Sequence, residues 1–102
     1  MHKPVIELIV NNHAGVMSHI TGLFARRAFN IEGILCGPMD GGETSRVFLL
    51  VNEDARLPQL VKQLEKLYDV REVRERDNYD RSIFDRLHEF VEEGPSVAVR
   101  SV

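Results

Sequence analysis

The fold is decided by residues 5–36, which read VIELIVNNHAGVMSHITGLFARRAFNIEGILC. Over residues 5–10 the side chains alternate between two faces, one of them wholly apolar, as in a β-strand. After a polar loop, apolar residues recur every three or four positions over residues 17–28, as on one face of a helix. Asn30 is expected to end this helix, and residues 31–36 predict a second strand. The stretch therefore predicts a strand, a helix and a strand in that order.

The rest of the chain repeats this pattern. Gly37-Pro38 is expected to end the second strand, and the turn signal Asp40-Gly41-Gly42-Glu43 joins it to an antiparallel third strand at Arg46–Val51. Residues 70–76 (VREVRER) predict a short, highly charged strand of the kind found at a sheet edge. Between these strands lies a second helix, whose apolar stripe is Leu57, Leu60, Val61, Leu64 and Leu67.

These elements give the order βαββαβ. Crossover connections between parallel strands are right-handed, which places both helices on one face of the sheet. The predicted fold class is therefore α+β, a ferredoxin-like domain with a four-stranded antiparallel sheet.

The C-terminal segment predicts one more helix. Ser82 is a candidate cap, and Gly94-Pro95 is expected to end the helix. Its apolar stripe consists of Ile83, Phe84, Leu87, Phe90 and Val91. Such a stripe packs either on its own domain or on a partner protein, and the sequence leaves both interpretations open. Residues 96–102 are expected to be frayed.

The composition is that of one small globular domain. The chain has 102 residues, 43% of them hydrophobic and 28% charged, and domains of this size often gain stability by pairing. A net charge of −3 gives no electrostatic reason to bind nucleic acid or an anionic membrane. No apolar run approaches the roughly 20 residues of a membrane span, and the first residues lack a signal-peptide pattern. One cysteine cannot form an internal disulfide, so we expect a cytoplasmic protein.

No group of residues predicts catalysis. Ser18 and His19 are adjacent on the expected helix, where neighbours point about 100° apart, so they cannot form a dyad. His13 has no clear carboxylate beside it, and Cys36 is expected to be a small buried hydrophobe within its strand. No spacing of histidine, cysteine and aspartate resembles a metal site. We therefore expect a protein that is not itself an enzyme.

The loop before the first helix is the most informative segment. Residues 12–16 end where a helix begins, so free backbone N–H groups and the helix dipole converge at one point. Such a point accepts an anion, for example a carboxylate. Gly15 would let a ligand approach the backbone, or permit a positive φ angle. A tight strand-to-helix turn would need the same glycine, and the local pattern does not separate the two.

Residues 12–36 also carry a more specific resemblance. Its motifs are Gly15-Val16-Met17, Gly22-Leu23-Phe24, Arg26-Arg27 and Asn30-Ile31-Glu32. They closely resemble the ACT domain of the small, regulatory subunit of acetolactate synthase (acetohydroxyacid synthase), in its short, valine-sensitive type. The similarity extends to about residue 76, and Ala28 stands where many relatives have glycine. The resemblance implies an ACT domain over residues 1–77. The C-terminal helix and tail over residues 78–102 are predicted from the local pattern alone, because the resemblance does not extend to them.

The resemblance implies a branched-chain amino acid site where two copies of the domain pair edge to edge. The backbone of residues 13–17 would hold the ligand carboxylate, and Asn30 of the other copy would reach its polar end. Ile34 and Cys36, on the presumed edge strand, would help to line an apolar pocket. The implied valine-binding residues are Asn12, His13, Ala14, Gly15, Val16, Met17, Asn30, Ile34 and Cys36.

The resemblance also implies a partner. This is a large catalytic subunit that carries thiamine diphosphate, Mg²⁺ and FAD and condenses two 2-keto acids in branched-chain amino acid biosynthesis. The present chain would bind none of those cofactors. It would stimulate the large subunit and confer feedback inhibition by valine. The docking surface is not implied: Arg26, Arg27 and the helix at 82–93 are candidates, and their charged residues could equally form a solvated face. Two alternatives share the fold order: a stand-alone amino-acid-binding ACT protein that serves another enzyme, and a small acylphosphatase-like hydrolase.

Overall fold

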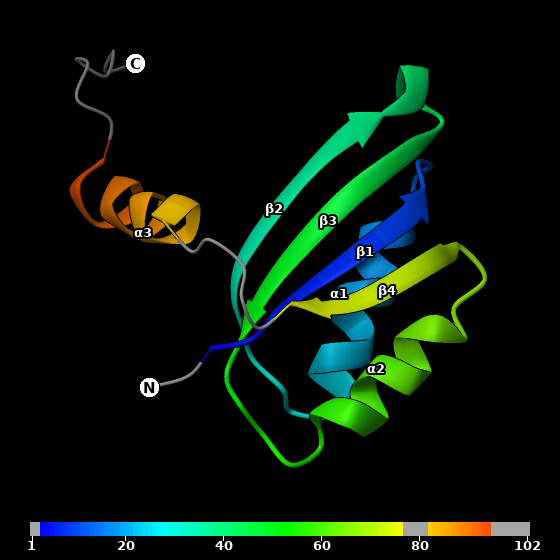
Figure 1. The fold of residues 1–102 in the computed structure, drawn as a ribbon, viewed down its shortest axis with the longest axis horizontal. Coiled ribbons are helices and arrows are strands. Elements are labelled where there is room, and N and C mark those ends of the chain that lie inside the picture. The colour runs from blue at the N-terminus through cyan, green and yellow to red at the C-terminus, as the bar shows by residue number, and fades with distance from the viewer. Residues whose placement is uncertain (1–2, 77–81, 95–102) are drawn as a thin grey trace.

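A sheet with two helices on one face makes up most of the described chain (Figure 1). The computed structural model describes residues 3–76 and 82–94. The elements are, in order, β1 (Val5–Asn11), α1 (Val16–Arg26), β2 (Ile31–Met39), the 3₁₀ turn η1 (Asp40–Gly42), β3 (Thr44–Val51), α2 (Leu57–Glu65), β4 (Val70–Arg76) and α3 (Ser82–Glu93). The predicted βαββαβ order, with a further C-terminal helix, is confirmed.

The four strands form one antiparallel sheet in the order β2-β3-β1-β4. The central strand β1 places Leu8 opposite Val47 of β3 and Val73 of β4. Because β1 and β2 are each antiparallel to β3, they run parallel to one another. The outer strands are therefore β2 and the charged strand β4, which agrees with the edge position predicted for β4.

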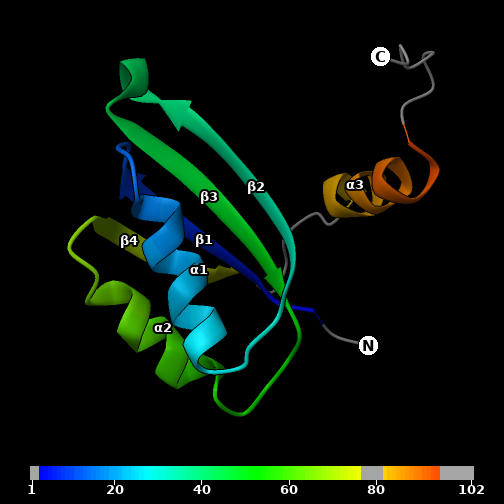
Figure 2. The same ribbon diagram turned by 180° about the vertical axis from the view of Figure 1, so that it is seen from behind.

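One face of the sheet is covered by α1 and α2 (Figure 2). The alternating residues Ile6, Leu8 and Val10 of β1 point at these helices and are almost completely buried. Leu57, Leu60 and Leu64 of the predicted α2 stripe are buried as well, whereas Val61 and Leu67 are half-buried at its margin. The remaining core residues on this face are Val16, Ile20, Leu23, Phe24, Phe29, Val47, Leu49, Val51 and Val70.

The end of α1 differs from the prediction. The helix ends at Arg26, and Ala28 lies outside it with φ of 51°, in the left-handed region. The Ala28 N–H donates to the Ala25 carbonyl at 3.0 Å, and the Phe29 N–H donates to the Phe24 carbonyl at 2.9 Å. These two bonds are those of a Schellman motif, and the edge-to-face contact of Phe24 with Phe29 (5.7 Å between centroids) is its usual hydrophobic partner.

The second strand is longer than predicted. Gly37-Pro38 does not end β2, which continues to Met39, and β3 begins at Thr44. Proline is tolerated because β2 is an outer strand, where a missing N–H need not break a ladder hydrogen bond. The predicted turn between the strands is present as η1, with positive φ at each of its three residues.

The C-terminal helix α3 contacts the other face of the sheet, which α1 and α2 leave uncovered and which we call the open face. The contact is made by the first turns of α3. The Phe84 side chain is 1% exposed and packs with Val5 and Leu50, while Leu87 is half-buried at the margin of this cluster. Of the predicted stripe, the Ile83 side chain lies outside the described part of the chain. The predicted domain boundary at residue 77, and residues 95–102, also lie outside it.

Candidate functional site

The loop between β1 and α1 is anchored to the neighbouring strands. The Asn12 N–H donates to the Glu43 carbonyl at 3.0 Å, and its side-chain amide donates to the Gly42 carbonyl at 2.8 Å. On the other side, the Asn11 N–H donates to the Asp69 carbonyl at 2.8 Å. The loop is therefore tied to the β2–β3 turn and to the start of β4.

His13 forms an ion pair that the sequence did not predict. Its Nε2 lies 2.6 Å from Oδ1 of Asp69, which is 8% exposed. The expectation that His13 has no carboxylate beside it was wrong. Asp69 comes directly before β4, and the pairing of β4 with β1 brings together two residues that are 56 positions apart.

The surroundings of this pair favour its charged form. The Ala14 carbonyl oxygen lies 3.1 Å from Nδ1 of His13, and the Asp69 carboxylate faces Nε2. Only an imidazolium can donate to both acceptors, so the two contacts raise the pKa of His13 above its ordinary value of 6.5. Burial raises the pKa of Asp69, but hydrogen bonds from Asn11 and His13 outweigh it, and that pKa lies below its ordinary 3.8. The pair adds a side-chain link between the loop and the start of β4.

The start of α1 has the features of an anion-binding position. Gly15 precedes the helix with φ of 90°, and no side chain in the described part of the chain caps this end. The Val16 N–H is directed at the His13 carbonyl, at 3.4 Å, and the next N–H groups, of Met17 and Ser18, have no acceptor within the helix. A Cβ built on Gly15 would have no atom within 4 Å, so the space above it is open. The positive φ explains the glycine even without a ligand.

The other predicted site residues lie elsewhere in the same chain. Asn30 is exposed and lies beyond the far end of α1, a helix of 11 residues and hence about 16 Å long. Within one chain it therefore does not meet the loop at residues 12–15. Ile34, which is 39% exposed, and Cys36 lie between these two ends, on the outer strand β2.

Cys36 is exposed, and the expectation that it would be buried was wrong for the single chain. Ile34 lies opposite Leu49, and Cys36 lies opposite Val47, both of which are core residues. The two β2 side chains thus share the helix-covered face of the sheet, but they lie at its edge, beyond the cover of the helices. Neither Ile34 nor Cys36 is buried by its own domain.

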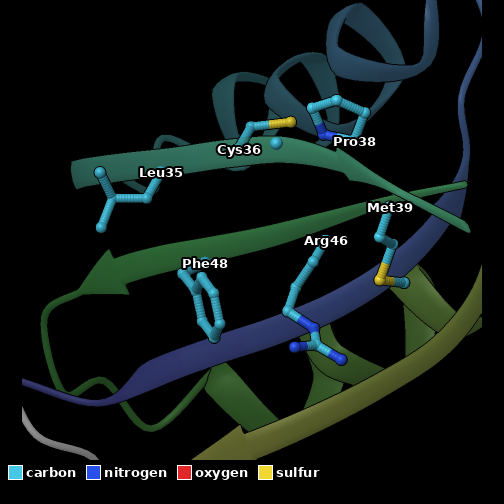
Figure 3. Close-up of a pocket in the computed structure, with 7 residues that line it drawn as sticks. Leu35, Cys36, Pro38, Met39, Arg46 and Phe48 are labelled. Atoms are coloured by element: carbon cyan, nitrogen blue, oxygen red, sulfur yellow. The ribbon is translucent and has the colours of Figure 1, made fainter. Parts of the chain in front are cut away.

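A shallow hollow of about 340 Å³ lies beside β2, and the sequence did not indicate it. Leu35, Met39, Arg46 and Phe48 are directed to one side of the strands there, and Cys36 and Pro38 to the other (Figure 3). Alternation along β2 and β3 explains these directions. Leu35 lies opposite Phe48, and Gly37 lies opposite Arg46, on the face of the sheet that α1 and α2 leave open. We call this feature the β2–β3 hollow.

Of the arginines considered as docking residues, Arg27 is engaged within the fold. It donates to the Leu23 carbonyl at 3.4 Å and to the side chain of Gln63 on α2. No helix in the described residues is long and apolar enough to cross a membrane.

Residues 6–72 match the model of the AHAS small subunit-like ACT domain, where AHAS stands for acetohydroxyacid synthase. This chain belongs to that family. This chain is 50% identical over 86 residues to the acetolactate synthase isozyme 1 small subunit of Escherichia coli (strain K12). That match covers 84% of this chain and 88% of the E. coli protein, so the two are of similar extent.

Longer proteins resemble the chain over part of their length. The acetolactate synthase small subunit of Haemophilus influenzae is 37% identical over 85 residues, which are 79% of this chain but 52% of that protein. The crystal structure of the acetolactate synthase small subunit from Thermotoga maritima superposes with a TM-score of 0.68 at 28% identity. This match covers 98% of the present chain and 73% of the Thermotoga maritima chain, and it supports the ACT fold.

Proposed function

We propose that this chain is the regulatory subunit of an acetolactate synthase, and that it works as a homodimer which binds valine between its two copies. The relatives that support the enzyme assignment are named as small subunits of acetolactate synthase. One observation carries the ligand assignment. The open helix start at Gly15 and the exposed Asn30 lie at opposite ends of one domain, with the exposed edge of β2 between them.

A two-fold axis beside β2 would complete such a site. Antiparallel pairing of β2 with its copy inverts one domain relative to the other, so the loop end of one domain lies beside the Asn30 end of its partner. Ile34 and Cys36 then lie near the junction, where the partner would cover their exposed side chains. The pairing joins two four-stranded sheets and removes an outer edge from each.

The groups that would meet at this junction suit a branched-chain amino acid. The backbone N–H groups of residues 13–17, at the start of α1, would donate hydrogen bonds to the ligand carboxylate. The side-chain oxygen of the partner copy's Asn30 would accept a hydrogen bond from the ligand ammonium group. Ile34 and Cys36 would supply the apolar surface for a branched side chain. Valine is the ligand that the resemblance favours.

Regulation would follow from unequal binding. Valine can inhibit the catalytic subunit only if it binds one arrangement of the complex more tightly than another. The catalytic subunit, and not this chain, would carry the thiamine diphosphate, Mg²⁺ and FAD that the reaction needs. The alternative of a stand-alone amino-acid-binding protein predicts a different partner, and co-purification distinguishes the two.

A complementation experiment tests whether the site spans two copies. Gly15→Asp puts a carboxylate where the ligand carboxylate would lie, and Asn30→Ala removes the polar group of the other copy. Each variant alone should lose most of its valine binding in calorimetric titration. A mixed dimer of the two variants has one doubly damaged site and one intact site, so mixing them should restore up to one site per mixed dimer.

Two controls keep this experiment interpretable. Gly15→Asn has nearly the shape of Gly15→Asp and the same backbone strain, but no charge, and it should retain much more valine binding. Asn30→Ala should leave the dimer intact in sedimentation. A mixed dimer without valine binding would contradict a shared site. Equal loss in Gly15→Asn and Gly15→Asp would show that backbone strain, not charge, causes the defect.

A further inference from the structure

Helix α3 is only partly covered by its own domain. Its apolar stripe begins with the buried Phe84 and the half-buried Leu87. The same stripe continues to Phe90 and Val91, which are 58% and 71% exposed. The first turns of α3 are therefore packed on the sheet, and the last turns present an apolar surface to solvent.

The direction of α3 accounts for this difference. Figures 1 and 2 show α3 beyond β2, on the side of the sheet away from β4. Phe84 rests over Gly33 of β2, where a Cβ would lie 3.0 Å from the ring. From that point α3, a helix of 12 residues and about 18 Å, extends past the outer strand. From Phe84 to Glu93 the helix is about 14 Å long, and strands in a sheet are about 4.8 Å apart, so this part would span about three further strands.

In the edge-to-edge dimer proposed above, those further strands belong to the second copy. Antiparallel pairing about the middle of β2 brings Gly33 of one copy beside Gly37–Met39 of the other. These residues border the β2–β3 hollow on the same open face that Phe84 contacts. A Cβ built on Gly37 would meet no atom within 4 Å, so the floor of the hollow can accept a side chain from above.

We infer that α3 of each copy crosses the junction and packs Phe90 and Val91 into the β2–β3 hollow of the other copy. This inference rests on the β2-edge dimer of the proposed function. The hollow offers Leu35, Met39 and Phe48 to the two exposed apolar side chains. Both surfaces would be removed from water by the same contact, twice in each dimer.

The charges of the two surfaces are complementary. Around its apolar stripe α3 carries four exposed carboxylates, those of Asp85, Glu89, Glu92 and Glu93, and one arginine, Arg86. On the open face, Arg46 and Arg76 share one carboxylate, that of the buried Glu7, at 3.4 and 2.8 Å. The Arg46 side chain is half exposed at the rim of the hollow, where it retains positive charge toward an acidic helix.

A spin-label experiment tests the contact between copies. In a Cys36→Ser background, a nitroxide is attached at Glu93→Cys, and this chain is mixed with unlabelled chain enriched in ¹⁵N. Only a nitroxide on the other copy can then broaden the observed amides. We expect broadening at Gly37, Met39 and Phe48. A label at Tyr68→Cys, an exposed position (94%) next to β4, should leave these amides sharp.

A second measurement follows dimer stability by sedimentation. Replacing Phe90 and Val91 together by serine should raise the dimer dissociation constant by about tenfold or more. Tyr68→Ser, which removes another exposed aromatic side chain, should leave it unchanged.

Each contrary outcome has a separate meaning. A dimer without broadening in the hollow, or with an unchanged dissociation constant in the double variant, would overturn the α3 contact and leave the dimer standing. A monomeric chain would overturn both. Signals from the hollow that change only when the catalytic subunit is added would assign this face to that subunit instead.

Discussion

Ala28→Gly is expected to stabilise the protein. Ala28 has φ of 51° in the turn that ends α1, and its side chain is exposed, so the substitution removes strain without removing packing. An L-residue in the left-handed region costs about 1–2 kcal/mol, whereas glycine adopts it freely. Glycine also gives the unfolded chain more entropy, at a cost of about 0.4–1 kcal/mol. The net gain is about 0.5–1 kcal/mol.

Thermal unfolding followed by circular dichroism measures this gain. Unfolding entropies of about 2.1 cal/mol/K per residue mean that 1 kcal/mol shifts the Tm of a chain of 102 residues by about 4–5 °C. Ala28→Gly should therefore raise the Tm by about 2–5 °C. Chain concentration must be the same in every sample, because the Tm of the proposed dimer would depend on it.

Ala25→Gly is the matched control. Ala25 is also exposed, but it lies within α1, where glycine costs about 1 kcal/mol relative to alanine. The same chemical change made three residues apart should thus shift the Tm in opposite directions. If Ala28→Gly lowered the Tm as Ala25→Gly does, the left-handed end of α1 would be refuted.

Further predictions concern the loop and α3. In an NMR titration His13 should show a pKa above 6.5, and Asp69→Asn should lower it; an unchanged value would contradict the ion pair. Because the pKa of His13 is raised on folding, its stabilising contribution is complete below its unfolded pKa and is lost as pH rises through the folded one. The contribution of Asp69, whose pKa is lowered, is present above about 3.8 and is lost as pH falls through the folded value. Phe84→Ala should cost about 3 kcal/mol, seen as faster amide exchange in α3 while β1 stays protected. Gly33→Ala, whose Cβ would crowd the Phe84 ring, should have the same effect to a smaller extent, and normal protection of α3 in both variants would refute the packing of Phe84.

The periodicity of the sequence predicted most of the fold. Alternation over residues 5–10 identified the face of β1 that packs on the helices, and the spacing of Leu57, Leu60 and Leu64 identified the buried stripe of α2. Two boundaries were wrong for local reasons. Pro38 is compatible with β2 because this strand is at the edge, and Ala28 adopts a left-handed conformation that its residue type does not indicate.

The contacts around the loop could not be predicted in the same way. The His13–Asp69 pair depends on the β1–β4 pairing, so nothing near His13 in the sequence indicates it. The exposure of Cys36 depends on β2 being an outer strand, which is a property of the strand order and not of the local sequence. The open face of the sheet, where the β2–β3 hollow lies, likewise becomes evident only when β2 and β3 are paired.

Asn30 and Gly15 lie at opposite ends of α1, too far apart for one ligand to reach both within a single copy. Because Asn30 and Gly15 flank α1, a ligand that touches both groups must lie between two copies. If valine is that ligand, its binding is linked to dimer formation, and each should strengthen the other by the same factor. The assignment of valine to this junction is a prediction that depends on the second copy.

A reconstitution assay with the catalytic subunit tests the proposed regulation. The purified chain is added to the catalytic subunit of the acetolactate synthase from the same organism, and acetolactate formation is measured over a series of valine concentrations, with lysine as the control. We predict that the chain raises the activity, that valine then inhibits it, and that lysine does not. Activity that is unchanged by the chain, or that rises with it but stays insensitive to valine, would contradict the proposed function.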